Sequence, residues 1–279
     1  MRTEAVASTE SLSRDVCWVC ANEEYQLVCI KQGYRYVSCS ECGVVRQHPY
    51  PTDQEIARYY GSYQSKKASD SVYLTDTGFA GFKHDKELTF ADLGLDDDAF
   101  SGKRICDVGC ATGQFVQMMM ERRPAYVMGL DASPECVAIA QARGLHVMQG
   151  DFLELEETFD VINMSHLIEH VPRPTRFFKQ AFRLLAPGGW FLIETPVIGA
   201  VSQAFGEHWR YFMPVEHINL FPQNALFRAC VEAGFAVKKW IRFGSGNDSG
   251  TVPAPNKRAM DIIAKRHGYG DTLAALFVK

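Results

Sequence analysis

The stretch Arg104-Ile-Cys-Asp-Val-Gly-Cys-Ala-Thr-Gly113 begins with a short apolar run and continues into a turn punctuated by glycine. The residues that follow, 114–120, are mostly apolar and predict a helix. Gly109 and Gly113 lack a Cβ, so we expect the turn to bring the backbone close to a ligand. The helix would direct unpaired N–H groups and the positive end of its dipole toward that ligand. The stretch therefore predicts the strand, turn and helix around which an α/β domain is built.

The residues of the turn narrow the choice of ligand. Dinucleotide-binding turns carry glycine at their first, third and sixth positions, where this chain has Gly109, Ala111 and Gln114. Asp107, just before the first glycine, would face the ligand and repel a pyrophosphate. A positively charged ligand would be favoured there instead. S-adenosylmethionine carries an ammonium and a sulfonium group and no phosphate, so it fits this turn.

Beyond the turn, apolar strands alternate with helical segments, which is the pattern of a parallel, doubly wound sheet. The second strand, 125–130, is followed by Asp131. A carboxylate at this place lies beside the ribose of a nucleotide that crosses the edge of the sheet. It can accept hydrogen bonds from both ribose hydroxyls. Further strands are predicted at 146–149, 158–164 and 190–193.

The sequence D-V-G-C-A-T-G at 107–113 closely resembles motif I of the class I S-adenosylmethionine-dependent methyltransferases. The later segments follow in that family's order, which implies a seven-stranded Rossmann-like sheet of order 3-2-1-4-5-7-6. Its last strand, 272–278, would insert antiparallel beside strand five. The resemblance places Asp151 at the adenine amino group and Phe152 beside it, although Asp151 could instead cap the next turn. The residues assigned to the cofactor are Asp107, Gly109, Cys110, Ala111, Gly113, Asp131, Ala132, Asp151, Phe152, Met164 and Ser165.

Two histidines follow the fourth strand. His166 and His170 are four residues apart and would share one face of a helix, which suggests metal ligands. Pro172 would end such a helix early, and related enzymes use this segment to shape the floor of the pocket. We therefore assign no metal to this pair.

The N-terminal cysteines form two closely spaced pairs. Cys17-Trp-Val-Cys20 and Cys39-Ser-Glu-Cys42 give the spacing C-x2-C-x18-C-x2-C, which is typical of a four-cysteine zinc site. Four thiolates complete a tetrahedral shell and leave no open position, so the zinc would be structural. The segments 25–30 and 34–37 predict a hairpin between the pairs. The sequence therefore predicts a zinc ribbon over 15–50 with Cys17, Cys20, Cys39 and Cys42 as ligands.

The other predicted regions are a disordered tail at 1–14, a helical linker or cap at 51–100 and the methyltransferase domain at 101–279. Within the linker, 86–95 predicts a helix. Thr52 and Glu55 form a capping-box pattern that predicts a shorter one. Three tyrosines follow, and they either pack the ribbon onto the larger domain or bring a hydroxyl to the mouth of the active site. They are Tyr59, Tyr60 and Tyr63.

After strand five closes at 194–196, the segment 197–221 is long and rich in aromatic residues and histidine. Long loops at the carboxyl edge of a parallel sheet commonly carry function, so we expect a substrate lid here. Methyl transfer needs positioning and, in some reactions, removal of a proton. Histidine is a natural base near neutral pH, and an adjacent carboxylate would orient it. The candidate catalytic residues are His217 with Glu216, His208 as a reserve base, and Tyr211.

The ribbon, the class I core and the Glu-His pair together resemble the sugar C-methyltransferases. Those enzymes act on keto sugars carried on a nucleotide diphosphate, and a His or Tyr removes the proton alpha to the ketone. That family places a tyrosine shortly before the Glu-His pair, where this chain has Pro214 and Val215. It also carries a large additional C-terminal domain, whereas this sequence ends at Lys279.

The composition of the chain limits the classes of function that it can have. The 279 residues carry a net charge of −4 and lack the basic stripe of a nucleic-acid binder. No run approaches the roughly 18 apolar residues of a membrane helix. Nine cysteines without an export signal indicate a reducing compartment, so we expect a cytoplasmic protein. We predict an S-adenosylmethionine-dependent methyltransferase that methylates carbon or oxygen of a small molecule, such as a sugar or another natural-product intermediate. The alternatives are an RNA or protein methyltransferase guided by the ribbon, and a non-catalytic cofactor-binding partner subunit.

Overall fold

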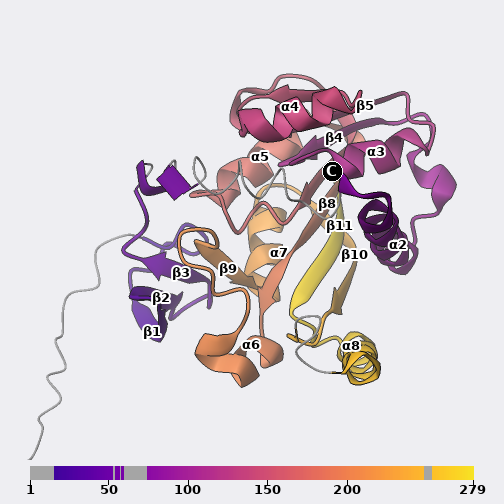
Figure 1. Cartoon of the computed structure of the whole chain (residues 1–279). Coiled ribbons are helices and arrows are strands. Elements are labelled where there is room, and N and C mark those ends of the chain that lie inside the picture. Colours follow the sequence, from indigo (N-terminus) through magenta and orange to yellow (C-terminus); the bar gives the residue numbers. More distant parts are fainter. Residues whose placement is uncertain (1–15, 53, 57, 60–73, 248–252) are drawn as a thin grey trace, which may run out of the picture.

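The N-terminal ribbon, drawn in indigo in Figure 1, lies at one side of a larger α/β unit. The predicted tail at 1–14, together with Tyr60 and Tyr63, falls outside the residues that the structure describes, whose ranges close this paragraph. Within the part of the chain that is described, no helix is both long and apolar enough to cross a membrane. The computed structural model describes residues 16–52, 54–56, 58–59, 74–247 and 253–279.

A central mixed sheet organises the larger unit. Its strands are β4 (Arg104–Val108), β5 (Tyr126–Asp131), β6 (Val147–Gln149), β7 (Phe159–Ser165), β8 (Leu185–Ile198), β10 (Ala236–Phe243) and β11 (Thr272–Val278). Their spatial order is β6-β5-β4-β7-β8-β11-β10, which is the predicted order 3-2-1-4-5-7-6. The first five are parallel, and β11 lies antiparallel between β8 and β10. The predicted fold class is therefore confirmed.

Helices cover both faces of this sheet. One face carries α2 (Asp76–Leu93) and α3 (Gln114–Met120), and the other carries α5 (Pro174–Leu184) and α7 (Gln223–Glu232). Successive residues of a strand point to opposite faces. Ile105 and Val161 accordingly pack with α2 and α3, whereas their neighbours Cys106 and Ile162 pack with α5 and α7. All four are fully buried. This two-sided burial explains why the parallel strands are nearly continuous apolar runs.

Several predicted boundaries differ from the structure, among them the start of strand five, which is Leu185 rather than Trp190. The helix predicted at 86–95 is the end of α2, which begins at Asp76 because the Thr75 hydroxyl accepts from the Gly78 N–H and caps it. The strand predicted to close at 194–196 continues to Ile198. It does so because 194–196 pair with β11, and the next two residues pair with β9 (Asn219–Pro222).

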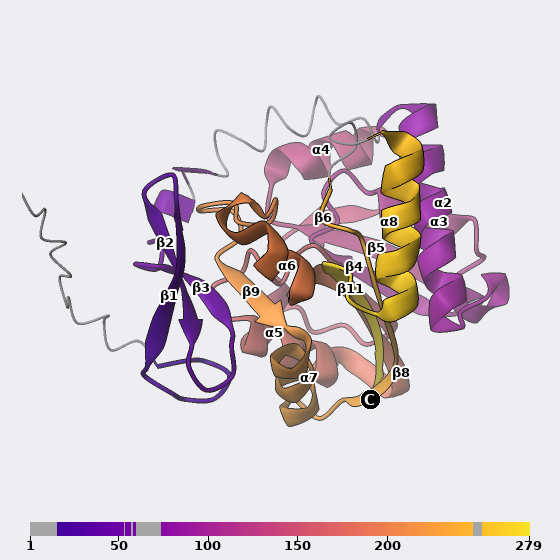
Figure 2. The ribbon, with the colours of Figure 1, turned by 90° about the horizontal axis from the view of Figure 1, so that it is seen from below.

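The ribbon is a three-stranded antiparallel sheet that continues into the central sheet. It consists of β1 (Tyr25–Lys31), β2 (Tyr34–Cys39) and β3 (Val45–His48), and β1 with β2 forms the predicted hairpin. β3 pairs with β9, and β9 pairs with the end of β8 through Val197 and Phe221. Figure 2 shows the ribbon at the end of the molecule opposite α8 (Ala254–His267). Backbone pairing therefore fixes the ribbon to one edge of the larger unit.

The segment predicted as a lid, 197–221, is largely packed against the ribbon. It contains α6 (Ala200–Phe205) and the 3₁₀ helix η4 (Gly206–His208), and it ends in β9. Trp209 and Phe212 are buried in a cluster with Tyr36 of β2 and Val45 of β3. This packing makes the second half of the segment a fixed wall.

Candidate active site and metal centre

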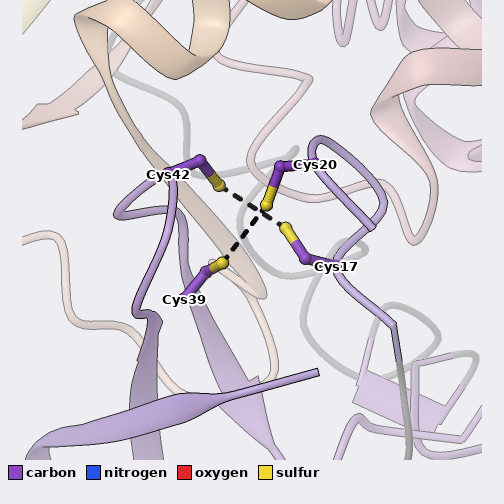
Figure 3. A group of neighbouring side chains, drawn as sticks. All are labelled: Cys17, Cys20, Cys39 and Cys42. Atoms are coloured by element: carbon purple, nitrogen blue, oxygen red, sulfur yellow. Dashed lines mark hydrogen bonds between the residues drawn. The ribbon is translucent and has the colours of Figure 1, made fainter. Parts of the chain in front are cut away.

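The four predicted metal ligands converge on one point between the two turns of the ribbon (Figure 3). The sulfur–sulfur distance is 3.5 Å between Cys17 and Cys42 and 3.4 Å between Cys20 and Cys39. All four sulfur atoms lie within 4.8 Å of one another. A tetrahedral ion with bonds of about 2.3 Å to sulfur holds its sulfur atoms about 3.8 Å apart. The quartet therefore fits a tetrahedral metal.

Local backbone geometry produces this arrangement. The Ala21 N–H donates to the Cys17 carbonyl at 2.8 Å, and the Gly43 N–H donates to the Cys39 carbonyl at 2.9 Å. Both donors lie in the left-handed region, with φ of +61° and +74°, so each cysteine pair folds back on itself. The hydrogen bond between Cys17 and Cys42 lowers the pKa of Cys17 to about 5 and raises the pKa of Cys42. One proton is thus held between the two sulfur atoms, and a metal, which binds the thiolate form, would displace it.

A cleft of about 1150 Å³ opens at the carboxyl edge of the central sheet. Asp107 of β4 and Asn163 of β7 line it, with α2 on one wall and α8 on the other. An ion pair between Asp92 of α2 and Lys265 of α8 joins the two walls. Small-molecule pockets usually measure about 300–1,000 Å³. The cleft therefore has room for two small molecules together.

The predicted ligand turn, 107–113, borders this cleft. Gly109 and Gly113 have left-handed φ angles of +71° and +84°. A Cβ added at Gly109 would lie 2.8 Å from a Leu167 methyl, and one added at Gly113 would lie 2.6 Å from a Leu145 methyl. The sequence predicted that these glycines let a ligand come close to the backbone. In the structure, the side chains of Leu167 and Leu145 lie close to the backbone at these two positions.

Replacing Gly113 with alanine tests this packing. The new Cβ would combine left-handed strain with overlap against Leu145, and we expect the free energy of unfolding to fall by about 2–4 kcal/mol. Gly102→Ala is the matched control, because Gly102 has φ +70° and open space around an added Cβ. It should lose only about 1–2 kcal/mol. Equal losses for the two variants in urea denaturation would show that the contact with Leu145 relaxes at no cost.

Asp107 is a buried carboxylate at the floor of the cleft, with 4% of its surface exposed. Its Oδ1 accepts from Asn163 Nδ2 at 2.7 Å. Burial raises the pKa of Asp107 to about 7, although the bond from Asn163 and the charge of Lys86 oppose this shift. The carboxylate is therefore a poorly solvated negative charge beside the turn, which suits a cationic ligand group.

Asp131 ends β5 and holds the turn in place. Its Oδ2 accepts from the Ala111 N–H and its Oδ1 accepts from the Ser133 N–H, each at 2.8 Å. A carboxylate can accept about four hydrogen bonds, so capacity remains for a ribose hydroxyl. The sequence predicted the position of Asp131 and missed its bond to the turn.

The residues after β6 mainly have structural contacts. Asp151 accepts from the Leu153 N–H at 2.9 Å and caps the 3₁₀ helix η3 (Phe152–Glu154), which is the alternative raised by the sequence. The Phe152 ring is buried and stacks on Phe177 with centroids 5.7 Å apart. Of the residues assigned to the cofactor, the cleft is lined by Asp107, Gly109, Cys110, Ala111 and Ser165. Those outside its lining are Gly113, Asp131, Ala132, Asp151, Phe152 and Met164.

An ionic network that the sequence did not predict runs along the cleft. Lys86 Nζ lies 2.9 Å from Glu194 Oε2 and donates to Ser165 Oγ at 3.1 Å. His166 lies 3.5 Å from Glu194 through Nε2 and 3.2 Å from Glu169 through Nδ1. Burial lowers the pKa of His166, but the two carboxylates outweigh burial and raise it to about 9. With this pKa His166 would carry a proton at neutral pH, which makes it a poor candidate for the base.

The segment 166–172 forms turns instead of the predicted helical face. His166 has a left-handed φ of +49°, which no helix contains, and His166 and His170 approach the same Glu169 oxygen, at 3.2 Å and 3.9 Å. His170 Nδ1 lies 2.8 Å from the Glu216 carbonyl oxygen. The spacing of His166 and Glu169 could have signalled their pairing, whereas Lys86 gave no local signal.

The structure places only some of the predicted catalytic residues at the cleft. The His208 side chain is 83% exposed and lies outside the lining. Tyr211 and Glu216 line the cleft. Glu216 Oε2 accepts from the Tyr59 hydroxyl at 2.7 Å, so one of the tyrosines near the ribbon does reach the active-site wall. His217 is 4% exposed and lies behind this wall.

The predicted pairing of the Glu216 carboxylate with His217 is not formed. His217 Nδ1 lies 2.9 Å from the Tyr211 carbonyl oxygen, and the two rings stack with centroids 5.7 Å apart. Burial and the neighbouring His170 together lower the pKa of His217 to about 4, although Glu169, Glu216 and the bond to Tyr211 oppose this shift. A neutral imidazole with so low a pKa would be a weak base. Adjacency in sequence suggested a pair, but the Glu216 side chain bonds to Tyr59 instead.

Comparisons with known proteins agree with this fold. The magnesium protoporphyrin IX methyltransferase of Synechocystis, solved with bound SAH, aligns with a TM-score of 0.57 and 12% identity over 82% of this chain and 100% of that chain. A SAM-dependent methyltransferase of Archaeoglobus fulgidus aligns with a TM-score of 0.52 and 18% identity over 75% of this chain and 100% of that chain. At these identities the likeness shows the fold.

Proteins of similar sequence are also methyltransferases by name. The ubiquinone biosynthesis O-methyltransferase of Xanthomonas oryzae pv. oryzae is 35% identical over 105 residues, which cover 34% of this chain and 44% of that protein. The matched part thus spans less than half the length of that relative. The family described as "Methyltransferase domain" matches residues 85–239, from α2 through β10. Because this match covers more than half of the 279 residues, the chain belongs to the methyltransferase-domain family.

Proposed function

We propose that the protein is an S-adenosylmethionine-dependent methyltransferase that acts on a small molecule. The observation that carries this proposal is the buried carboxylate of Asp107, which lines the cleft beside the glycine turn. A desolvated carboxylate favours a cationic partner, and the ammonium group of the cofactor is one. Membership of the methyltransferase-domain family supports the same cofactor.

Other residues would orient the cofactor. The remaining lone pairs of Asp131 would accept from its ribose hydroxyls. The imidazolium of His166, which lines the cleft next to Ser165, would attract the carboxylate of the methionine part. When bound, the cofactor supplies the methyl group. The protein would contribute position and charge, which are the main requirements of an in-line transfer.

Two observations favour a small acceptor. The cleft of about 1150 Å³ has room for a cofactor and a compact second molecule, and the net charge of −4 disfavours nucleic acid. The curated relatives are named for ubiquinone biosynthesis and O-methylation, so we propose oxygen as the first acceptor to test. Carbon of a keto sugar is the second, because the ribbon and the consecutive residues Glu216 and His217 resemble the sequence of the sugar C-methyltransferases.

We propose Glu216 as the general base in place of His217. Glu216 lines the cleft, and the Tyr59 hydroxyl fixes its carboxylate at 2.7 Å. His217 supports the wall through Tyr211, against which its ring stacks. In this arrangement Glu216 would accept the proton of the acceptor, and His217 would be a positioning residue.

Replacing Glu216 with glutamine should lower kcat by about 10²–10⁴-fold, the usual contribution of a general base. The amide keeps the size of the side chain and an oxygen for Tyr59 but cannot take a proton. The dissociation constant for the cofactor, measured by calorimetry, should change less than about twofold. His208→Ala, at an exposed site outside the cleft, should retain wild-type turnover. A Glu216→Gln enzyme with wild-type kcat would exclude this role.

We propose zinc as the ion bound by the cysteine quartet. Four thiolates saturate a tetrahedral ion, so the zinc would stabilise the ribbon and take no part in the reaction. It would fix the turns that precede β1 and follow β2, and through β3 it would support the wall that carries Glu216.

The function is tested with purified protein, methyl-labelled S-adenosylmethionine and a panel of phenols, hydroxylated quinone precursors and nucleotide-linked keto sugars. We expect label in one class of acceptor and release of S-adenosylhomocysteine. Calorimetry with the cofactor alone accompanies this assay. Absence of cofactor binding would refute the proposal, whereas binding without transfer to any acceptor would favour a partner subunit.

A further inference from the structure

A second group of metal-binding side chains lies between the turn after β7 and the wall before β9. Glu169, His170 and His217 each offer a ligand atom, and these atoms lie within 4.8 Å of one another. His170 Nε2 is 3.9 Å from Glu169 Oε1. The two imidazole rings meet edge to face with centroids 4.8 Å apart. Glu169 is fully buried, as is most of His217.

The hydrogen bonds of the two histidines determine which nitrogen atom carries the proton of the neutral ring. Nδ1 of His170 lies 2.8 Å from the Glu216 carbonyl oxygen, and Nδ1 of His217 lies 2.9 Å from the Tyr211 carbonyl oxygen. A carbonyl oxygen can only accept, so each neutral ring carries its proton on Nδ1, and Nε2 is the unprotonated nitrogen that can bind a metal. Metal-binding histidines commonly have this arrangement, in which the second nitrogen donates to a fixed acceptor.

The carboxylate of Glu169 is also held by neighbours. Its Oε2 accepts from the Thr195 hydroxyl at 2.9 Å, and its Oε1 lies 3.2 Å from His166 Nδ1. All three candidate ligands are therefore oriented by a second group, which is what a preformed site requires. Ligands about 2.1 Å from a tetrahedral ion lie about 3.4 Å apart, so the side chains, whose ligand atoms are now within 4.8 Å of one another, would rotate toward a bound ion.

We propose that Glu169, His170 and His217 form a second metal site, which binds a divalent ion that prefers nitrogen and oxygen ligands, such as zinc. The site differs from the ribbon in both ligand type and place in the fold. His170 lines the cleft, so the position left open by three protein ligands is accessible to water or to a molecule in the cleft. A bound ion would also join the turn at 166–172 to the wall at 209–218.

The test counts metal ions in the full-length protein. After equilibration with excess zinc and desalting, mass spectrometry of the metal should find two zinc ions per wild-type chain. Glu169→Gln, which keeps the shape of the side chain but removes the anionic ligand, should bind one. His208→Ala is the matched control at an exposed histidine and should bind two. One zinc per wild-type chain, or two in Glu169→Gln, would overturn the proposal.

Cobalt substitution separates loss of a ligand from loss of the fold. Thiolate charge-transfer bands and visible bands at long wavelength report the cysteine quartet, whereas weaker visible bands at shorter wavelength report a site of nitrogen and oxygen ligands, which are stronger-field than thiolates. Glu169→Gln should lose the weaker bands and keep the thiolate bands. A wild-type spectrum with thiolate bands alone would contradict the second site. Neither measurement depends on methyl transfer, so their outcome is independent of the proposed activity.

Discussion

Cys39→Ser is expected to release the ribbon's metal and unfold β1 to β3. In small zinc peptides a structural zinc contributes about 10–16 kcal/mol at pH 7, which is comparable to the total stability of a typical domain, about 5–15 kcal/mol. Cys39 ends β2 and its sulfur lies 3.4 Å from that of Cys20. Losing one of the four thiolates leaves the turns to packing and to hydrogen bonds such as those of Asn22 with Glu24 and Ser40, which contribute about 0.5–1.5 kcal/mol each.

The effect should spread beyond the ribbon. Trp209 and Phe212 are buried against Tyr36 and Val45, which belong to ribbon strands. Unfolding of β2 and β3 would expose these aromatic side chains and loosen the wall that carries Glu216. We therefore expect loss of zinc, a red shift in tryptophan fluorescence and reduced turnover to occur together.

The matched control is Cys29→Ser. Cys29 is half-buried in β1 and lies outside the quartet, so its serine variant should keep zinc and the wild-type fluorescence. If Cys39→Ser retained a full equivalent of zinc with unchanged fluorescence, the ribbon would be stabilised by its packing rather than by the metal.

The sequence predicted the features that rest on local pattern. The turn 107–113, the spacing of the cysteines and the strand at 272–278 each follow from neighbouring residues, and each lies where it was expected. The sheet order followed from resemblance to a family, since inserting β11 beside β8 has no local signature.

The sequence could not predict contacts between distant segments. Tyr59 and Glu216, which form a hydrogen bond, are 157 residues apart in the sequence. Lys86 of α2 forms an ion pair with Glu194 of β8. His217 shows that neighbouring positions in the sequence do not establish a contact between side chains. Its neighbour Glu216 accepts a hydrogen bond from Tyr59, whereas the carboxylate grouped with His217 is Glu169, which lies 48 positions earlier, in the turn after β7. Tertiary packing decided which carboxylate met which histidine.

Replacing Asp107 with asparagine should weaken S-adenosylmethionine binding by about 10–100-fold at pH 8. A hydrogen bond to a charged group contributes about 1.5–3 kcal/mol, and each 1.4 kcal/mol corresponds to a factor of ten in the dissociation constant. The asparagine oxygen can still accept from Asn163, so the local packing is preserved. The change removes the negative charge that would face the ammonium group.

The pH dependence gives this prediction a distinct signature. Burial raises the pKa of Asp107 from its usual 3.8 to about 7, so the carboxylate takes up a proton as the pH falls through 7. Wild-type affinity should then decrease by up to about tenfold per pH unit below 7, because one proton competes with the ligand. Asp107→Asn should lack this dependence between pH 5 and 8.

The stability of the cofactor-free protein should depend on pH in the opposite direction to the affinity: as the pH rises, the affinity increases and the stability decreases. A carboxyl whose pKa is raised by folding binds its proton more tightly in the folded state, so it loses stability as the pH rises from about 4 to 7. Asparagine carries no such cost, and Asp107→Asn should therefore melt at the same or a higher temperature than wild type at pH 8. Asp98→Asn, at a side chain that is 78% exposed, should leave both affinity and its pH profile unchanged. Normal cofactor binding by Asp107→Asn would refute the charge complementarity on which the proposed cofactor rests. The buried carboxylate would then destabilise the fold without contributing to binding.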